Sequence, residues 1–260
     1  MSIEEICKKY GIKNYTINDD GSIDVDEHVI ILGMGLTELP LKFNKVIGNF
    51  NCSNNELTSL KGCPKEVTGD FFCTDNKLTD LKGGPKSVGG GFFCGYNELT
   101  SLKDGPKSVR NNYYCRSNQL TSLEGSPESI GDYFNCETNK LTDLKGGPKS
   151  VGGHFDCDDN ELTSLEGCPK NIEGLFYCQK NKLTSLKGGP ESISKDFVCW
   201  ENDLISLEGC PKYVGGDFDC SDNKITNLNY IPNNLRSFTC SDTPIGSIFY
   251  RRLIQYQHKN

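Results

Sequence analysis

The chain of 260 residues has few of the residues on which catalysis and metal binding usually depend. It contains only three histidines, His28, His154 and His258, and they lie far apart in the sequence. No CxxC pair, GxSxG motif, phosphate-binding loop or catalytically spaced pair of acids is present. We therefore expect no enzymatic activity, no cofactor and no bound metal.

The sequence is also poor in cationic residues and in long apolar runs. Lys and Arg number 28 against 35 Asp and Glu, which gives a formal net charge of -7. Because a nucleic-acid backbone is bound by clustered Lys and Arg, we expect no direct contact with nucleic acid. No apolar run approaches the ~18 residues of a membrane span, and residues 1–5 lack the basic and apolar regions of a signal peptide. These absences predict a cytoplasmic protein without a membrane partner.

A 21-residue unit occupies most of the chain. Its cysteine recurs at a constant step of 21 residues, and so does an asparagine three residues further on. The cysteines are Cys52, Cys73, Cys94, Cys115, Cys136, Cys157, Cys178, Cys199 and Cys220. The asparagines are Asn55, Asn76, Asn97, Asn118, Asn139, Asn160, Asn181, Asn202 and Asn223. A period of about 20 to 29 residues around an x-Leu-x-x-Asn-x-Leu core is typical of a leucine-rich-repeat solenoid, so we expect one elongated domain.

The spacing within the unit predicts which side chains point inward. Residues two apart on an extended strand face the same side, so the aromatic residue that opens the unit and the Cys two residues later both face the core. Two Leu and one Val complete this core. The Asn amide is able to bond to the backbone of adjacent turns and to form a ladder inside the solenoid. Because the Cys side chains all point the same way, we expect free, buried, reduced thiols.

The fold class that follows is mainly β, with a parallel sheet on the concave face of the solenoid. Pro64 and its equivalents lie beside Gly and leave too few residues for a convex helix, so that side should be extended, polyproline-like or built from single turns. Residues 1–28 are interpreted as a cap, with a helix starting at Ser2 and a hairpin around Asp20 and Gly21. Residues 29–246 form the solenoid of about eleven units, and residues 247–260 a C-terminal capping helix.

The unit Phe-x-Cys-x-x-Asn-x-Leu-Thr-Ser-Leu-x-Gly-x-Pro-x-x-Val resembles the short leucine-rich repeats of bacterial and tailed-phage proteins. It is similar, less closely, to the repeats of secreted bacterial effectors. The segment from Tyr15 to Val25 looks like the capping start of small phage-encoded members. The resemblance implies parallel strands on a concave face and a role in protein binding. It does not imply the ubiquitin-ligase domain that the effectors often carry, because only about a dozen residues follow Ser247.

Departures from the repeat at outward positions are the candidates for function. The residue between the aromatic and the Cys faces the concave side, and three successive units carry an aromatic there, about 4.8 Å apart. Exposed aromatics beside an Arg are typical of binding hot spots, although cross-strand stacking that only stabilises the sheet is the alternative. The predicted aromatic patch for partner binding comprises Phe72, Phe93, Tyr96, Tyr114, Arg116, Tyr177 and Trp200.

The C-terminal half of the same face is predicted to be acidic. It favours a partner with a basic surface, and the alternative is protection of an exposed sheet against aggregation. Asp156, Asp158 and Asp159 have the chemistry to bind Ca²⁺, but three carboxylates without a ligand loop do not predict a metal site. His154 is interpreted as a surface residue because no thiol shares its face. The predicted acidic patch comprises Glu137, Asp156, Asp158, Asp159, Asp196, Glu201, Asp217, Asp219 and Asp222.

Three functions are compatible with these patches. The first is a non-enzymatic module that grips a protein with its concave face; in a phage setting, the target is a host or antiviral-defence protein that it inhibits. The second is an acidic nucleic-acid mimic that occupies a basic groove, which requires only the acidic half. The third is a structural or adhesive phage component that contacts many copies edge to edge.

Overall fold

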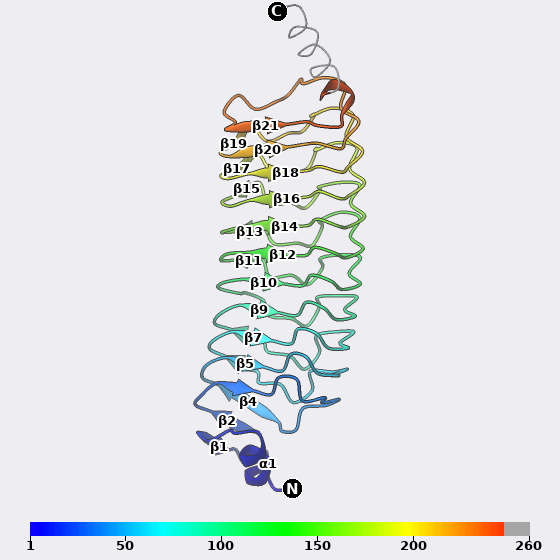
Figure 1. Ribbon diagram of the computed structural model, residues 1–260. Helices are drawn as coiled ribbons and strands as arrows, with labels where there is room; N and C mark the ends of the chain where they lie inside the picture. Colours follow the sequence, from blue (N-terminus) through cyan, green and yellow to red (C-terminus); the bar gives the residue numbers. More distant parts are fainter. Residues whose placement is uncertain (247–260) are drawn as a thin grey trace, which may run out of the picture.

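Each 21-residue unit forms one turn of a solenoid, and the turns stack along a common axis (Figure 1). The computed structural model describes residues 1–246. One parallel sheet of eleven strands runs along the stack, in the order β21-β20-β18-β16-β14-β12-β10-β9-β7-β5-β3. Its strands are β3 (Val29–Ile30), β5 (Phe50–Asn51), β7 (Phe71–Phe72), β9 (Phe92–Phe93), β10 (Tyr113–Tyr114), β12 (Phe134–Asn135), β14 (Phe155–Asp156), β16 (Phe176–Tyr177), β18 (Phe197–Val198), β20 (Asp217–Asp219) and β21 (Ser237–Thr239). The predicted leucine-rich-repeat solenoid is confirmed.

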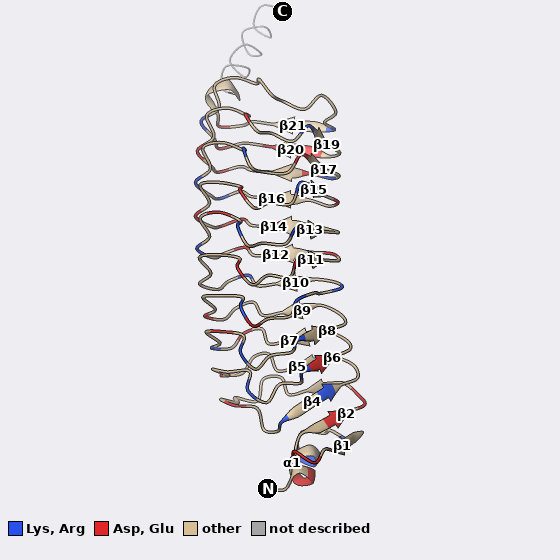
Figure 2. Cartoon of the chain, turned by 180° about the vertical axis from the view of Figure 1, so that it is seen from behind, with Lys and Arg blue, Asp and Glu red and all other residues tan. Residues whose placement is uncertain are grey.

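A second, mostly parallel sheet forms the side of the solenoid that carries the proline column, and Figure 2 shows its strands in a view of the chain from behind. It has two five-stranded parts, which isolated bridges from Val109 to Val88 and Ile130 connect. Its strands are β1 (Tyr15–Ile17), β2 (Ile23–Val25), β4 (Phe43–Val46), β6 (Glu66–Val67), β8 (Ser87–Val88), β11 (Ser129–Ile130), β13 (Ser150–Val151), β15 (Asn171–Ile172), β17 (Ser192–Ile193) and β19 (Tyr213–Val214).

The segments on this side are extended, one of the conformations that the sequence predicts, but their pairing into a sheet is not predicted from the sequence. From β6 onward each strand of the second sheet has two residues and buries only one of them. A strand of this length shows no alternation of apolar and polar residues in the sequence. These segments pair because stacking of the turns brings equivalent residues side by side.

The N-terminal segment has the elements that the sequence predicts. Helix α1 (Ile3–Lys9) begins with a capping box, in which Ser2 Oγ accepts from Glu5 N at 3.3 Å and Glu5 accepts from Ser2 N at 2.8 Å. Strands β1 (Tyr15–Ile17) and β2 (Ile23–Val25) form an antiparallel hairpin, and β2 continues in parallel to β4. The predicted C-terminal helix over residues 247–260 lies outside the described residues.

The core is a set of columns, one residue from each turn. The aromatic, the Cys, both Leu and the Val or Ile are buried in turn after turn. From Phe50 to Phe218 the inward rings lie 4.8 to 6.0 Å apart between centroids. Such contacts bury aromatic surface that no single turn buries alone, so each turn depends on its neighbours for stability.

The asparagine column forms the predicted ladder. Asn139 donates from Nδ2 to the carbonyls of Cys115, Cys136 and Glu137 at 3.1 to 3.2 Å, and its Oδ1 accepts from Leu120 N at 3.0 Å. The residue before each Asn has a positive φ, 52° at Thr138, which turns the chain so that the Asn side chain points inward. The ladder satisfies backbone groups at the bend between sheet and loop that no strand partner reaches.

The cysteines are free, as the sequence predicts. All fourteen are unpaired, and all except Cys210 and Cys240 are buried. Burial raises the pKa of thiols such as Cys94 and Cys157 well above the usual value. Because the thiolate is the reactive form, these thiols are inert spacers in the core.

Tyr113 replaces Phe in the inward aromatic column, and its hydroxyl is buried without a hydrogen-bond partner. The Cys94 thiol beside it is only a weak partner. We expect Tyr113→Phe to raise the free energy of unfolding by about 1 kcal/mol, because it removes an unsatisfied buried hydroxyl. Urea unfolding measures the change, with Tyr114→Phe as the control because its ring is half exposed. A less stable Tyr113→Phe protein would contradict this account.

Candidate functional site

The solvent side of the eleven-stranded sheet, here called the strand face, carries an unbroken run of aromatic rings. Phe72 stacks on Phe93 with 4.6 Å between centroids and an interplanar angle of 10°. Phe93 meets Tyr114 edge-on at 5.1 Å, and Tyr114 meets Tyr133 edge-on at 5.2 Å. All four rings are half buried. We call Phe72, Phe93, Tyr114 and Tyr133 the aromatic strip.

Two glycines make room for this arrangement. A Cβ on Gly91 would lie 2.6 Å from the Phe93 ring, and a Cβ on Gly95 would lie 3.1 Å from Arg116 Cγ. The Phe93 ring and the Arg116 side chain therefore lie flat over backbone that a larger residue would fill. The glycines that replace larger residues of the repeat at these positions thus make space for the large side chains beside them.

Arg116 connects the aromatic strip to the acidic half of the strand face. Its guanidinium lies 5.0 Å from the ring centroid of Tyr96, and its Nη1 lies 3.1 Å from Glu137 Oε1. Tyr96 is 47% exposed and has a φ of +52°. A cation–π contact at such a site contributes roughly 0.5 to 1 kcal/mol, which orders the Arg116 side chain without burying it.

Tyr177 and Trp200, which the sequence groups with the aromatic patch, lie apart from the strip. In the strand register, Asn135 and Asp156 stand between Tyr114 and Tyr177. Both Tyr177 and Trp200 are half buried, and the Lys180 ammonium lies 5.2 Å from the Trp200 ring centroid. The seven predicted residues thus form two groups.

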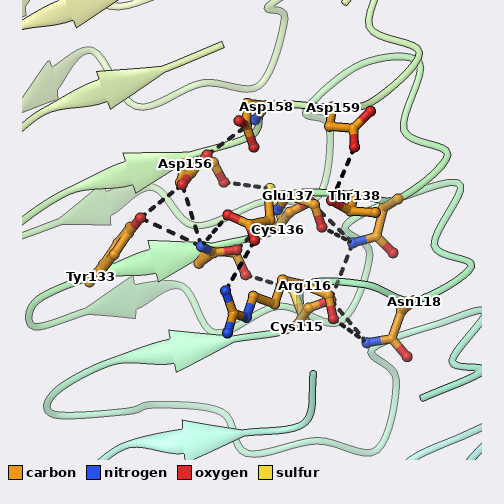
Figure 3. A network of polar contacts seen from close by, with 12 residues as sticks. Cys115, Arg116, Asn118, Tyr133, Cys136, Glu137, Thr138, Asp156, Asp158 and Asp159 are labelled. Atoms are coloured by element: carbon orange, nitrogen blue, oxygen red, sulfur yellow. Dashed lines mark hydrogen bonds and ion pairs between the residues drawn. The ribbon is translucent and has the colours of Figure 1, made fainter. Parts of the chain in front are cut away.

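Asp156, predicted as an outward carboxylate of the acidic patch, is buried and only 6% exposed. Its Oδ2 accepts from the Tyr133 hydroxyl at 2.8 Å and from Asn135 Nδ2 at 3.4 Å, and its Oδ1 accepts from Asp158 N at 3.2 Å (Figure 3). The expectation that it presents a free charge is wrong. It points to the strand face as the register requires, but larger neighbours from adjacent turns cover it.

Other carboxylates of the predicted patch are also engaged within the protein. Arg236 holds Asp217 through two bonds of 2.8 and 2.7 Å and lies 3.5 Å from Asp196. Asp219 accepts from the backbone N and the hydroxyl of Ser221 at 3.0 and 2.6 Å. The exposed members are Asp159, Glu201 and Asp222, each at the positive-φ position before an Asn. The free acidic surface is therefore smaller than the sequence suggests.

Glu137, Asp156 and Asp158 form a compact carboxylate cluster with oxygens within 4.8 Å of one another. Burial, followed by the charge of Asp158, raises the pKa of Asp156 to about 8. Glu137 accepts from Arg116 and from Asn135 Nδ2 at 3.0 Å, and Asp158 accepts from Gln179 Nε2 at 2.7 Å. Because every carboxylate already has a donor, we assign no metal to the cluster.

Asp159, which the sequence groups with Asp156 and Asp158 as oxygen ligands, is not part of this cluster. Its carboxylate accepts from the Thr138 hydroxyl at 3.3 Å. Glu137, from the preceding turn, takes its place beside the other two acids. The set that the structure brings together thus spans two turns.

Tyr133 and Asn135 are the site residues that the sequence analysis missed. The residue before the inward aromatic usually accepts a bond from the backbone of the next turn, as Asp70 does from Gly91 N at 2.7 Å. His154 occupies this position and accepts from Leu175 N through Nδ1 at 2.8 Å, so it is part of the scaffold. Gly91, Tyr133 and Leu175 depart from the Asn, Asp and His of this column, and Tyr133 is the aromatic among the three, which is the signal by which it was detectable.

Together these features define a leucine-rich-repeat solenoid with an aromatic strip on the outside of its long sheet. Among solved structures it is similar to YopM, a leucine-rich effector protein from Yersinia pestis, with a TM-score of 0.53, 18% identity, and coverage of 83% of this chain and 66% of that chain. It also matches YopM from Yersinia enterocolitica WA-314, with a TM-score of 0.44, 17% identity, and coverage of 83% and 64%. The chain thus spans slightly less than two thirds of the YopM chains.

Neither a protein-family model nor a curated protein sequence matches the chain. At 18% identity the likeness to YopM shows the fold. Within residues 1–246, no helix combines the length and the apolar character that crossing a membrane requires.

Proposed function

We propose that the protein is a non-enzymatic scaffold that binds a partner protein through its strand face. The aromatic strip is the observation that supports this role. The core of each turn is already filled by the inward aromatic, so the strip adds a second column of rings on the solvent side. Half-buried aromatics held on a rigid sheet beside an Arg are the residues that protein interfaces use as anchors.

The partner contacts the aromatic strip with apolar side chains. It contacts the neighbouring turns of the solenoid with basic side chains. Glu137 and Asp158 are half exposed next to the strip, and Asp159, Glu201 and Asp222 are exposed further along the stack. The net charge of -7 favours the same partner chemistry. In a phage-encoded setting, this partner is a host or antiviral-defence protein that the scaffold inhibits.

The two alternatives have less support from the site. A nucleic-acid mimic needs free carboxylates, but Asp156 is buried and Asp196 and Asp217 are paired with Arg236. A structural or adhesive role needs contacts between copies, and it does not explain why the rings gather on one part of the strand face.

Affinity capture from lysate of the cell that expresses the gene tests the proposal. We expect the triple variant Phe72→Ala, Phe93→Ala and Tyr114→Ala to recover the partner at least about tenfold less than wild type, because truncating an aromatic anchor costs about 2 kcal/mol or more. Quantitative mass spectrometry of the eluates measures the loss. Circular dichroism checks that the variant keeps its fold.

The matched control replaces exposed aromatics away from the strip. Tyr213→Ala with Tyr230→Ala, residues that are 50% and 64% exposed, should leave the recovery unchanged. If the triple variant retains the whole captured set while high salt or Asp158→Asn with Asp159→Asn removes it, the acidic surface and not the strip binds the partner. Recovery only within assembled particles would favour the structural role.

A further inference from the structure

Tyr133 ends the aromatic strip, and its ring position depends on a polar contact. Its hydroxyl donates to Asp156 Oδ2 at 2.8 Å in the next turn. Its ring lies edge-on between Tyr114 at 5.2 Å and His154 at 5.3 Å. Figure 3 shows the hydroxyl directed at the Asp156 carboxyl. The end of the strip is therefore joined to the carboxylate cluster by one hydrogen bond.

Asp156 is closed to a partner, although it belongs to the strand face. It is 6% exposed, and both of its oxygens accept hydrogen bonds from the protein. Burying a carboxyl beside two other acids is unfavourable unless it is hydrogen-bonded. The groups that satisfy Asp156 are the Tyr133 hydroxyl, the Asn135 amide and the Asp158 backbone. Asp156 therefore contacts neighbouring residues of the protein and not a partner.

We infer that Asp156 is a positioning residue that fixes the Tyr133 ring at the end of the aromatic strip and so sets the shape of the surface a partner meets. At most other turns, the residue in the Tyr133 position is held by a backbone bond to the next turn, as Asp70 and Asn112 are. A tyrosine side chain cannot form that bond and extends over the sheet instead. Asp156 holds the tyrosine instead, by accepting a hydrogen bond from its hydroxyl. The inference depends on the proposed function only for the use of the strip.

The surroundings of Asp156 also determine its protonation. Glu137 faces it from the turn of β12, Asp158 from its own turn, and Tyr177 from the turn of β16. Arg116 is paired with Glu137 and not with Asp156. With two acids and no cation beside it among residues 1–246, the Asp156 carboxyl retains a proton at neutral pH while it accepts from Tyr133.

The contribution of Asp156 to the stability of the folded protein depends on pH. The folded protein holds the proton on Asp156 up to about pH 8, while the ordinary pKa of the group is 3.8. The folded state therefore binds more protons than the unfolded state between these values, and the contribution of Asp156 to stability falls as pH rises from about 4 to 8. Asn at this position keeps an acceptor for Tyr133 and a donor for the acids, but it does not ionise.

NMR of protein labelled with ¹³C in the tyrosine rings tests the inference without any partner. In the wild type, the Tyr133 and Tyr114 signals should shift with a common midpoint near pH 8 as Asp156 ionises. In Asp156→Asn they should keep their low-pH positions up to pH 9. In Asp156→Ala the Tyr133 signal should move toward that of an exposed tyrosine at every pH. The signal that disappears in the Tyr133→Phe variant is that of Tyr133.

Asp159→Asn is the matched control, because it removes an exposed carboxylate of the same turn and should leave both signals unchanged. An unchanged Tyr113 signal shows that a variant keeps its core. Wild-type Tyr133 and Tyr114 signals in folded Asp156→Ala, or a titration in Asp156→Asn equal to that of the wild type, would overturn the inference. If the tyrosine signals respond as expected but the triple variant of Phe72, Phe93 and Tyr114 still captures the partner, the proposed function fails and the inference stands.

Thermal unfolding gives a second readout of the same proton. Relative to the wild type, the Tm of Asp156→Asn should rise by roughly 5 °C or more between pH 5 and pH 8 and then level off, because the wild type loses stability throughout that range. A Tm difference that does not change with pH would show that Asp156 is ionised throughout. It would contradict the protonated Asp156 carboxyl inferred above.

Discussion

Replacing Asn118 by Ala is expected to lower the free energy of unfolding by about 2 to 4 kcal/mol, because it leaves a buried backbone donor unsatisfied and weakens the bonding of three carbonyls. Asn118 is 4% exposed and donates to the carbonyls of Cys94, Cys115 and Arg116 at 3.0 to 3.2 Å. Its Oδ1 accepts from Leu99 N at 2.9 Å. Alanine leaves Leu99 N without a partner and removes one of the two donors of each carbonyl, since Asn97, Asn139 and Tyr96 N donate the others.

The measurement is chemical unfolding in urea, and Asn111→Ala provides the matched control. Asn111 is an exposed Asn of the preceding unit, so its loss should change the unfolding free energy by no more than about 0.5 kcal/mol, as for most surface substitutions. Because turns are stable only through their neighbours, the Asn118→Ala protein should also lose cooperativity, seen as a lower m-value. Equal stabilities of the two variants would show that water satisfies Leu99 N and that the carbonyls need only their second donors.

The core was predictable because each of its positions is repeated many times. A single Asn between two turns carries no signal, but a column of Asn at a constant step predicts a ladder that binds backbone, and Asn139 shows it. The second sheet was not predictable for the opposite reason. Its strands bury one Val or Ile each, so their pairing is a consequence of stacking and not of any local pattern.

The site was predictable in part. The two-residue alternation of a strand identifies Phe72, Phe93 and Tyr114 as neighbours on one face, and the ring distances agree. Alternation gives the face of a side chain but neither its burial nor its diagonal contacts. The bond from Tyr133 to Asp156 joins different columns of successive turns. Whether such columns meet depends on side-chain length and on what covers them, which the repeat does not encode.

Replacing Gly167 by Ala is expected to lower the free energy of unfolding by about 2 to 4 kcal/mol, because it combines backbone strain with overlap. Gly167 has a φ of +98°, and a Cβ there would lie 2.6 Å from Lys145 N and overlap the Leu144 carbonyl of the preceding turn. The loop column to which it belongs has a positive φ at Asp104 too, 68°, so the turn requires this conformation whatever the residue. Urea unfolding measures the loss.

Gly35→Ala separates the two causes, since Gly35 has a φ of +64° but nothing within 4 Å of an added Cβ. It should cost only about 1 kcal/mol, the usual penalty of a left-handed alanine. The additional loss at Gly167 then measures how closely one turn approaches the next. If the two variants lose the same stability, the stack expands to accept a methyl group, and the spacing between turns is set by the strands alone and not by the loop glycines.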